Sequence, residues 1–453
     1  MEIHPIVVLL VAVATVFLLI LRLKINAFIA LVTAATVVGL LSSKVALGDV
    51  MPEVATTFGR VCGSIGIVIA LAALIGQCLM ESGAADKIVR VFVRMSGEKN
   101  ASLALVSSGY VLSVPVFFDT VFYLLVPLAR AMRIRAGKNY LLFLMAISAG
   151  AAVTHSMVPP TPGPLAMAAI LGIDLGVMII VGACIAVPMS FVGWLFARNR
   201  NSVMNVPLRE TAGLSLSELE KLASREEKEL PSFFMSMLPI ALPVLLITSN
   251  TIVSTFAKES GMASVTSFLG NPNLALLASA AISIYLLASQ KGYTLSQLSK
   301  PIERALASGG LIILITAAGG AFGGMLVKAE VGKTLGDASQ EFGVPMLLLS
   351  FLLASLLKIA QGSGTVAMIT VSSIMAPIVI SSPPPFHVVY IACAIGCGVK
   401  LFSWMNDSGF WIYKQMSGLT EVEALQTWTP QLAIMGITGY VLTQIAAILF
   451  PLL

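Results

Sequence analysis

The sequence predicts an all-α polytopic membrane protein with two inverted-topology repeats. Each repeat would have about five transmembrane helices and one re-entrant hairpin, with broken helices at the midplane. Three observations predict this fold: an apolar composition, a duplicated pair of interrupted segments, and the placement of basic residues. Of the 453 residues, 57% are hydrophobic and 11% are charged, and the mean hydropathy is +0.95. A soluble domain carries about 25% charged residues, so the composition indicates a membrane protein.

Several apolar runs are long enough, or nearly so, to cross about 30 Å of hydrocarbon as helices. They are Ile6–Leu21, Ala27–Leu41, Ile65–Met80, Leu171–Ala197, Phe233–Ile252 and Leu432–Leu453. Glu2 and His4 stand where a signal peptide has basic residues, and no small-residue cleavage site follows the first run. We therefore expect the first span to be retained.

Two stretches interrupt long apolar runs in the same way, about 248 residues apart. They read AISAGAAVTHSMVPPTPG (Ala146–Gly163) and AIGCGVKLFSWMNDSGFW (Ala394–Trp411). Gly150 aligns with Gly398, and the helix-breaking Pro159-Pro160 pair falls on Asp407-Ser408. Lipid tolerates unwound backbone only where it is buried in protein or lines a polar cavity. Matching interruptions in two halves are therefore typical of a transporter's binding site.

A second pair of segments precedes these at nearly the same offset. They read SVPVFFDTVFYLLVPLA (Ser113–Ala129) and SGTVAMITVSSIMAPIV (Ser363–Val379). The first belongs to an apolar stretch, 101–128, with basic loops on both sides, so the positive-inside rule places both of its ends in the cytoplasm. At about 28 residues it is too short for two full crossings. We expect a re-entrant hairpin with its tip near Ser113–Pro115, although two short full spans would also return the chain to the cytoplasmic side.

The stretch Arg198–Pro231 is the only long polar segment, and we interpret it as a cytoplasmic linker between the halves. The second half then starts from the cytoplasm, whereas the first starts outside. An odd number of crossings in each half gives the halves opposite orientations. The predicted organisation is a first inverted repeat over 1–197 (hairpin about 101–128, broken helix about 140–165), a linker over 198–231, and a second inverted repeat over 232–453 (hairpin about 344–380, broken helix about 386–411).

Three stretches resemble the signature stretches of the gluconate permease family of proton symporters. They are VPVFFDTVFYLLVPLA (Val114–Ala129), HSMVPPTPGPLA (His155–Ala166) and GSGTVAMITVSSIMAP (Gly362–Pro377). The resemblance covers essentially the whole chain and implies a secondary active transporter of the bacterial inner membrane, in a family whose members carry gluconate, other sugar acids and D-serine. The wider superfamily of ion transporters has inverted repeats with two re-entrant hairpins. Many sugar-acid members have His where Thr161 stands, so the substrate stays open.

A small hydroxy acid presents one carboxylate and several hydroxyls, so its site needs positive potential and hydrogen-bonding groups. Half-helix N-termini supply much of this without charged side chains. Gly362-Ser363-Gly364-Thr365 fits a hairpin tip that approaches the ligand, with Ser113 as its counterpart in the first half. The candidate substrate-binding residues are Ser113, Asp119, Thr120, His155, Thr161, Gly362, Ser363, Gly364, Thr365, Asn406, Asp407 and Ser408, with Thr154, Ser156 and Ser403 completing a polar midplane. The alternative is that these hydroxyls only bond back to carbonyls of their own helices.

Ionisable residues inside apolar segments are expensive and rarely idle. Asp119, His155 and Asp407 are the candidates for carrying the coupling proton. The alternatives are structural: a carboxylate at a helix N-terminus for Asp119, a packing side chain for His155, and a cap of the following half-helix for Asp407. Lys358 and Lys400 flank the second hairpin and the second broken helix. Either could attract an anion, but snorkelling to the interface is the commoner fate of such lysines.

Proton coupling is favoured over sodium coupling, because sodium-coupled relatives in the wider superfamily carry Ser-Asn-Thr at their hairpin tips and this tip has Gly364 instead of Asn. The open alternatives are a sodium-coupled carboxylate or D-amino acid transporter and, less favoured, an anion channel. An enzyme is not expected, because the three histidines form no His-Glu-x-x-His arrangement and no paired aspartate motif occurs.

The five cysteines show no metal-ligand spacing with histidines or carboxylates, so neither a metal nor another cofactor is expected. The net charge of +5 is better explained by membrane topology than by affinity for nucleic acid, because the basic residues lie in short loops. The expected partners are a small anionic organic substrate, protons and the lipid bilayer, and a homodimer is one open arrangement.

Overall fold

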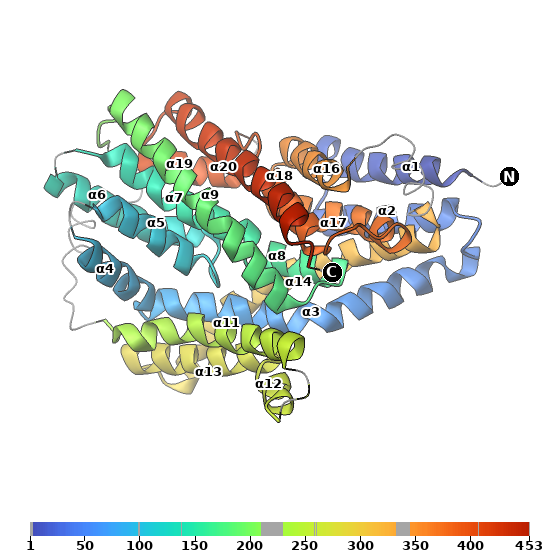
Figure 1. The fold of residues 1–453 in the computed structure, drawn as a ribbon, viewed down its shortest axis with the longest axis horizontal. Coiled ribbons are helices and arrows are strands. Elements are labelled where there is room, and N and C mark those ends of the chain that lie inside the picture. The colour runs from blue at the N-terminus through green and yellow to red at the C-terminus, as the bar shows by residue number, and fades with distance from the viewer. Residues whose placement is uncertain are drawn as a thin grey trace.

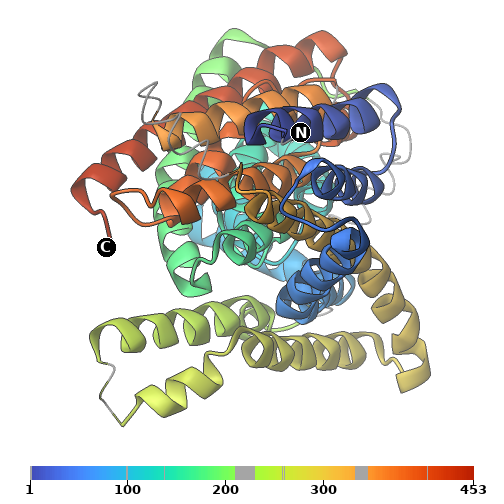
Figure 2. The same cartoon turned by 90° about the vertical axis from the view of Figure 1, so that its right-hand side faces the viewer.

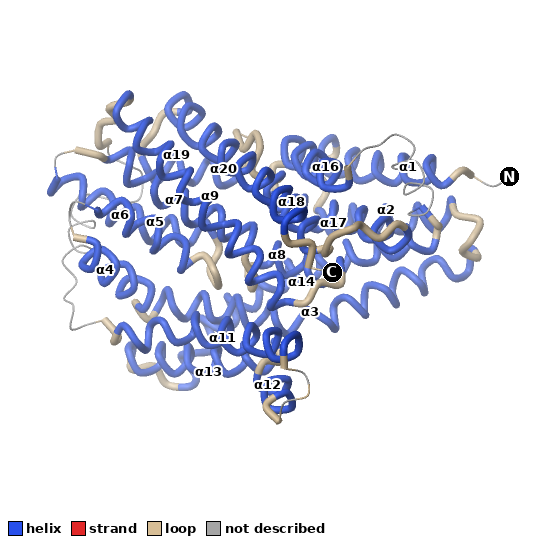
Figure 3. Tube along the Cα trace, viewed as in Figure 1, coloured by secondary structure: helices blue, strands red, loops and turns tan. Residues whose placement is uncertain are grey.

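The computed structural model describes residues 3–97, 100–136, 138–209, 230–257, 259, 261–331, 345–405 and 407–452. All regular elements in these ranges are helices, and no strand occurs among them (Figure 1, Figure 3). The prediction of an all-α protein is confirmed.

The helices of the first half are α1 (Pro5–Phe17), α2 (Ala27–Leu41), α3 (Val50–Glu81), α4 (Ala84–Ser96), α5 (Ala101–Leu112), α6 (Phe118–Ala136), α7 (Tyr140–Met157), α8 (Pro162–Leu171) and α9 (Leu175–Val203). Those of the second half are α11 (Phe233–Phe256), α12 (Ala263–Leu269), α13 (Pro272–Lys291), α14 (Leu295–Lys328), α16 (Met346–Gln361), α17 (Gly364–Ser381), α18 (Val389–Gly398), α19 (Ser408–Ser417) and α20 (Glu421–Leu449). A π-helical turn (Leu18–Arg22) follows α1, and a 3-10 turn (Leu47–Asp49) precedes α3.

Eight helical segments of the described chain are long and apolar enough to cross a membrane. They are α3 with the turn before it, α7 together with α8, α9, α11, α13, α14, α17 and α20. Shorter apolar helices, among them α2, α5, α16 and α18, accompany these. The chain is therefore a multi-pass membrane protein.

Four apolar segments within the described residues are interrupted. The first hairpin segment breaks between α5 and α6, and the second breaks at Gly362, whose φ of 84° is left-handed and therefore suits glycine. The first broken segment stops at Met157 and resumes at Pro162. The second stops earlier than the alignment suggested, at Gly398, and resumes only at Ser408.

The predicted linker over 198–231 begins inside a helix, because α9 continues to Val203. Residues 210–229 of that linker lie outside the described residues. The next helix, α11, starts at Phe233, where the Ser232 hydroxyl accepts a hydrogen bond from the Met235 amide as an N-cap.

The two longest helices, α3 and α14, pack along each other. In addition, α2 packs on α14 and α13 packs on α3, so each long helix contacts the helix that precedes its partner. Both views place α11, α12 and α13 together on one side of the molecule (Figure 1, Figure 2). Helices α7 and α18 are buried along nearly their whole length and form the centre of the molecule.

Two glycines that align in the sequence allow α5 to approach α7 and α16 to approach α18 closely. A Cβ added at Gly150 on α7 would lie 2.0 Å from the Val106 carbonyl oxygen on α5. A Cβ added at Gly398 on α18 would lie 2.4 Å from the Phe351 carbonyl oxygen on α16. The same packing solution therefore serves the pair α5–α7 and the pair α16–α18.

Candidate binding cavity

A cavity of about 180 Å³ lies between α6, α7, α16, α17, α19 and α20. Its lining comes from the start of α6, the end of α7, the second hairpin, the second break and α20. Since a single water needs about 10–15 Å³ of such volume, the cavity is large enough for several waters. The lining residues are Phe117, Phe118, Asp119, Ala152, His155, Ser156, Lys358, Ser363, Gly364, Thr365, Met368, Val399, Lys400, Ser403, Asp407, Ser408, Gly409, Trp428 and Leu432.

Seven of the twelve candidate site residues line this cavity: Asp119, His155, Ser363, Gly364, Thr365, Asp407 and Ser408. Ser113, Thr120, Thr161 and Gly362 do not belong to the lining. The Ser113 hydroxyl is buried and has no hydrogen-bond partner. Asn406 lies outside the described residues.

Asp407 is the centre of a polar cluster at the start of α19. Its carboxylate caps this helix by accepting a hydrogen bond from the Gly409 amide at 3.1 Å, as the capping alternative expected. The same carboxylate forms an ion pair with the Lys358 ammonium at 3.0 Å and accepts a hydrogen bond from the Ser403 hydroxyl. The Ser403 hydroxyl in turn accepts from the Trp428 indole N–H at 2.9 Å. Asp407 therefore ties the second break to both the second hairpin and α20.

Lys358 and Lys400 do not snorkel to an interface, and that expectation is wrong. Their exposed fractions are 4% and 7%, and both line the cavity. The Lys358 ammonium pairs with Asp407 and also donates to the Gly362 carbonyl at the hairpin tip. A lysine near the end of an apolar hairpin helix is itself a signal of a functional site, and this signal was available in the sequence.

Lys400 reaches across to the first half of the chain. Its ammonium donates to the Ala152 carbonyl on α7. No carboxylate of the described residues lies within ion-pairing distance of this ammonium, whereas the Lys358 ammonium has Asp407. The cavity wall therefore holds one paired cation and one cation without a counter-ion.

Three helix N-termini meet at the cavity, because α6, α17 and α19 begin at Phe118, Gly364 and Ser408. Free N–H groups and partial positive charge make such termini favourable for anions. Asp119 lies in the first turn of α6 and lines the cavity. The Ser363 hydroxyl caps α17 by accepting from the Val366 amide at 3.3 Å. This arrangement can hold an anion with hydroxyl groups.

The hydroxyls of the first break bond to their own helix or turn, as the structural alternative expected. Thr154 donates to the Gly150 carbonyl, Ser156 to the Val153 carbonyl and Thr161 to the Val158 carbonyl. His155 differs, because it lines the cavity and its Nδ1 is buried without a hydrogen-bond partner. Its ring lies 5.9 Å from that of Phe117, which also lines the cavity.

An aromatic cluster closes one end of the cavity. Phe118 and Trp428 line the cavity, and their ring centroids lie 5.1 Å apart. Phe122 contacts Phe118, and Tyr413 contacts both Phe122 and Trp428. These four rings join α6, α19 and α20.

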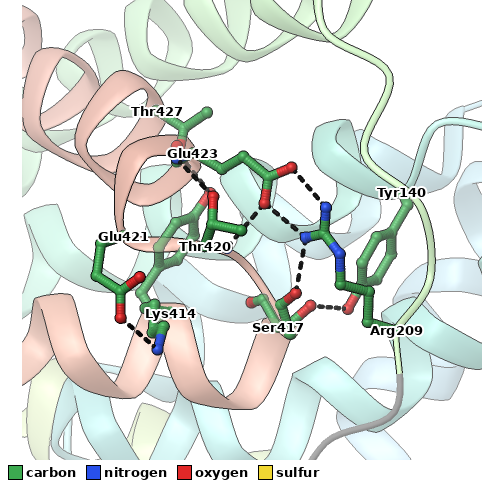
Figure 4. A network of polar contacts seen from close by, with 10 residues as sticks. Tyr140, Arg209, Lys414, Ser417, Thr420, Glu421, Glu423 and Thr427 are labelled. Carbon is green, nitrogen blue, oxygen red and sulfur yellow. Dashed lines mark hydrogen bonds and ion pairs between the residues drawn. The ribbon is translucent and has the colours of Figure 1, made fainter.

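A polar network lies beyond these rings, at the turn between α19 and α20 (Figure 4). Arg209 pairs with the Glu423 carboxylate at 2.6 Å and also donates to the Gly418 carbonyl. The Tyr140 hydroxyl donates to the Ser417 carbonyl at 2.8 Å. Arg209 follows α9, so residues near the start of the predicted linker hold this turn in place.

The chain is similar to known permeases over almost its whole length. A sequence model described as GntP family permease matches residues 4–449. A permease of Haemophilus influenzae is 37% identical over 449 residues, which cover 96% of this chain and 91% of that protein. The gluconate permease of Pseudomonas aeruginosa is 31% identical and covers 95% of each chain. The Gnt-II system L-idonate transporter of Escherichia coli is 32% identical, covering 96% of this chain and 98% of its own.

Two solved transporter structures share the fold at low sequence identity. The YdaH transporter of Alcanivorax borkumensis aligns with a TM-score of 0.65 at 14% identity, covering 94% of this chain and 98% of that chain. The antimetabolite efflux pump MtrF of Neisseria gonorrhoeae aligns with a TM-score of 0.68 at 15% identity, covering 90% and 85%.

Proposed function

The chain belongs to the GntP family of permeases and is a transporter rather than an enzyme, and from this we propose that it takes up a small sugar or hydroxy acid such as gluconate together with protons. Uptake would cross the bacterial inner membrane by alternating access. The cavity between the second break and the ends of α6 and α7 is the proposed substrate site. The observation that carries the proposal is the pair of buried lysines in this cavity, since relatives named for gluconate and idonate transport have anionic substrates.

Two inverted repeats are the proposed frame for alternating access. The order of long helix, hairpin, interrupted segment and final helix occurs as α3, α5–α6, α7–α8 and α9, and again as α14, α16–α17, α18–α19 and α20. The Lys400 ammonium donates to the Ala152 carbonyl. When Gly398 is aligned with Gly150, Ala152 is the residue of the first half that aligns with Lys400. Residues beside a two-fold axis contact their own equivalents, so this bond supports an axis through the cavity.

The charges of the cavity support coupling to protons. Lys358 and Asp407 neutralise one another, which leaves Lys400 and Asp119 as opposite charges that line the same cavity. An entering anion would make this site negative, and an uncompensated buried charge is expensive. A proton on Asp119 restores neutrality, with His155 and Asp407 as the alternative carriers. Binding of one anion is thereby linked to binding of one proton.

Closure toward the cytoplasm is assigned to the aromatic cluster and the Arg209–Glu423 pair. The aromatic cluster joins α6, α19 and α20, and the ion pair joins the segment after α9 to the start of α20. Alternating access then requires these contacts to separate when the substrate leaves.

Uptake into proteoliposomes tests the proposal. We expect gluconate or a related acid to accumulate when a pH gradient is imposed, and not when only a sodium gradient is imposed. Asp119→Asn should abolish this accumulation but keep counterflow, because exchange requires only the loaded carrier to reorient. Asp86→Asn, which changes a carboxylate paired with Arg90 outside the cavity, is the matched control. If the Asp119 variant still accumulates substrate, the proton carrier would be His155 or Asp407 instead. If a sodium gradient alone drives uptake, the protein would be coupled to sodium and not to protons.

A further inference from the structure

Lys400 is a buried cation whose hydrogen-bonding capacity is mostly unused. It lies in the break between α18 and α19 and is 7% exposed. An ammonium has three donors, and the one acceptor recorded for Lys400 among the described residues is the Ala152 carbonyl. A buried charge without a counter-ion is costly. The cavity beside it is the place from which a counter-ion can come.

The other lysine of the cavity is already satisfied. Lys358 has the Asp407 carboxylate at 3.0 Å and the Gly362 carbonyl, so an anion that bound Lys358 would have to displace Asp407 from it. Asp407 also holds the Gly409 amide and the Ser403 hydroxyl. These two hydrogen bonds hold the Asp407 carboxylate in place, and Lys358 therefore remains paired with it.

We propose that the Lys400 ammonium binds the carboxylate of the substrate, and that the site accepts one carboxylate and not two. This proposal rests on the proposed function and names the residue that holds the substrate's carboxylate. A second carboxylate would find no free cation in the described lining, and Asp119 lies in the same cavity. The N-termini of α17 and α19 add favourable potential near the bound carboxylate.

The remaining lining suits a hydroxylated tail. The Thr365 hydroxyl lines the cavity, and the buried Nδ1 of His155 has no partner in the protein. The Asp119 carboxyl group can hydrogen-bond substrate hydroxyls whether or not it carries the coupling proton. Phe117, Phe118 and Trp428 supply apolar surface for the carbon chain.

Binding of three related compounds to purified protein tests this assignment. The probes are gluconate, its dicarboxylate analogue glucarate and its neutral analogue glucitol, each measured by calorimetry and by thermal shift. We expect the wild type to bind gluconate at least tenfold more tightly than glucarate and to show no binding of glucitol. Equal affinity for glucarate would overturn the restriction to one carboxylate.

Lys400→Met should raise the Kd for gluconate roughly 30-fold or more, because a buried charge pair loses one partner. The midpoint of thermal unfolding without ligand should stay the same or rise, since the variant removes an unpaired buried charge. A purely structural lysine would give the opposite pattern, with a lower midpoint and unchanged affinity. Lys414→Met is the matched control, because Lys414 pairs with Glu421 outside the cavity and its loss should leave the Kd unchanged.

Lys400→Gln provides a second variant if the methionine variant does not fold. The amide can still donate to the Ala152 carbonyl but carries no charge, so gluconate affinity should fall as in the methionine variant. Wild-type affinity in either folded variant would overturn the role of Lys400 while leaving the proposed function intact. A wild-type protein that binds none of gluconate, idonate, glycerate and D-serine would overturn the proposed function, and the present inference with it.

Discussion

The two interrupted segments, α7–α8 and α18–α19, occupy matching places in the two halves but differ in chemistry. The break in the first segment spans only residues 158–161, and the hydroxyls of Thr154, Ser156 and Thr161 are satisfied by nearby carbonyls. The second extends over residues 399–407 and contains Lys400, Ser403 and Asp407, whose side chains reach α7, α16 and α20. The two segments therefore share a close helix contact at an aligned glycine but differ in their charged side chains.

If the two halves are inverted repeats, as proposed, this difference shows how their sequences have diverged. The aligned glycines Gly150 and Gly398 have the same role, because each admits the backbone of a hairpin helix. The charged residues have no such counterparts, since Lys400 aligns with Ala152 and Asp407 aligns with Pro159. The hydroxyls of the first break bond to local carbonyls, whereas the second break brings Lys400 and Asp407 to the cavity.

The largest expected loss of stability comes from breaking the ion pair between Lys358 and Asp407. Lys358→Met should lower the free energy of unfolding by about 3–5 kcal/mol, because it leaves the Asp407 carboxylate buried without its cation. The double variant Lys358→Met/Asp407→Asn should recover most of this loss, since asparagine is a good N-cap and no charge remains unpaired. Thermal unfolding in detergent measures both. If the double variant is no more stable than the single one, the ion pair does not explain the cost.

The two aligned glycines, Gly150 and Gly398, predict a smaller loss of stability that is similar in the two halves. Gly150→Ala and Gly398→Ala should each lower the free energy of unfolding by about 1–3 kcal/mol, because the added Cβ meets a backbone carbonyl that cannot move alone. Gly63→Ala in α3 is the control, since nothing lies within 4 Å of its added Cβ. A large loss at one aligned glycine and none at the other would show that the two halves do not share this packing.

The smallest expected effects, on substrate affinity, distinguish a hydroxyl that lines the cavity from one that bonds to a nearby backbone carbonyl. Thr365→Ala should weaken substrate binding by about 1–2 kcal/mol, the usual loss when a hydrogen bond is removed. Thr161→Ala should change it by less than about 0.5 kcal/mol, because its hydroxyl bonds to the Val158 carbonyl and lies outside the cavity lining. Calorimetric titration of both variants with the same acid measures the difference. Equal losses would place Thr161 in the site and make the two breaks chemically alike.

The sequence pattern did not predict which Ser and Thr hydroxyls line the cavity. Thr154, Ser156 and Thr161 were predicted from the same pattern as Ser363 and Thr365, yet only Ser156 among the first three lines the cavity. A hydroxyl within reach of a carbonyl of its own helix bonds there or turns outward according to the space that neighbouring helices leave. Spacing along one segment does not contain that information.

The sequence by itself determined that this chain is a helical membrane protein of a permease family with interrupted apolar segments, although it placed the second break too late in the chain. Those features follow from composition and from local backbone preferences at Gly, Pro and Ser, which act over a few residues. Only the tertiary structure decided that Lys358 faces Asp407 while Lys400 faces the first half. Such pairings depend on how helices distant in sequence cross, and a lysine in an apolar segment becomes a paired, an unpaired or a snorkelling cation according to which neighbour meets it.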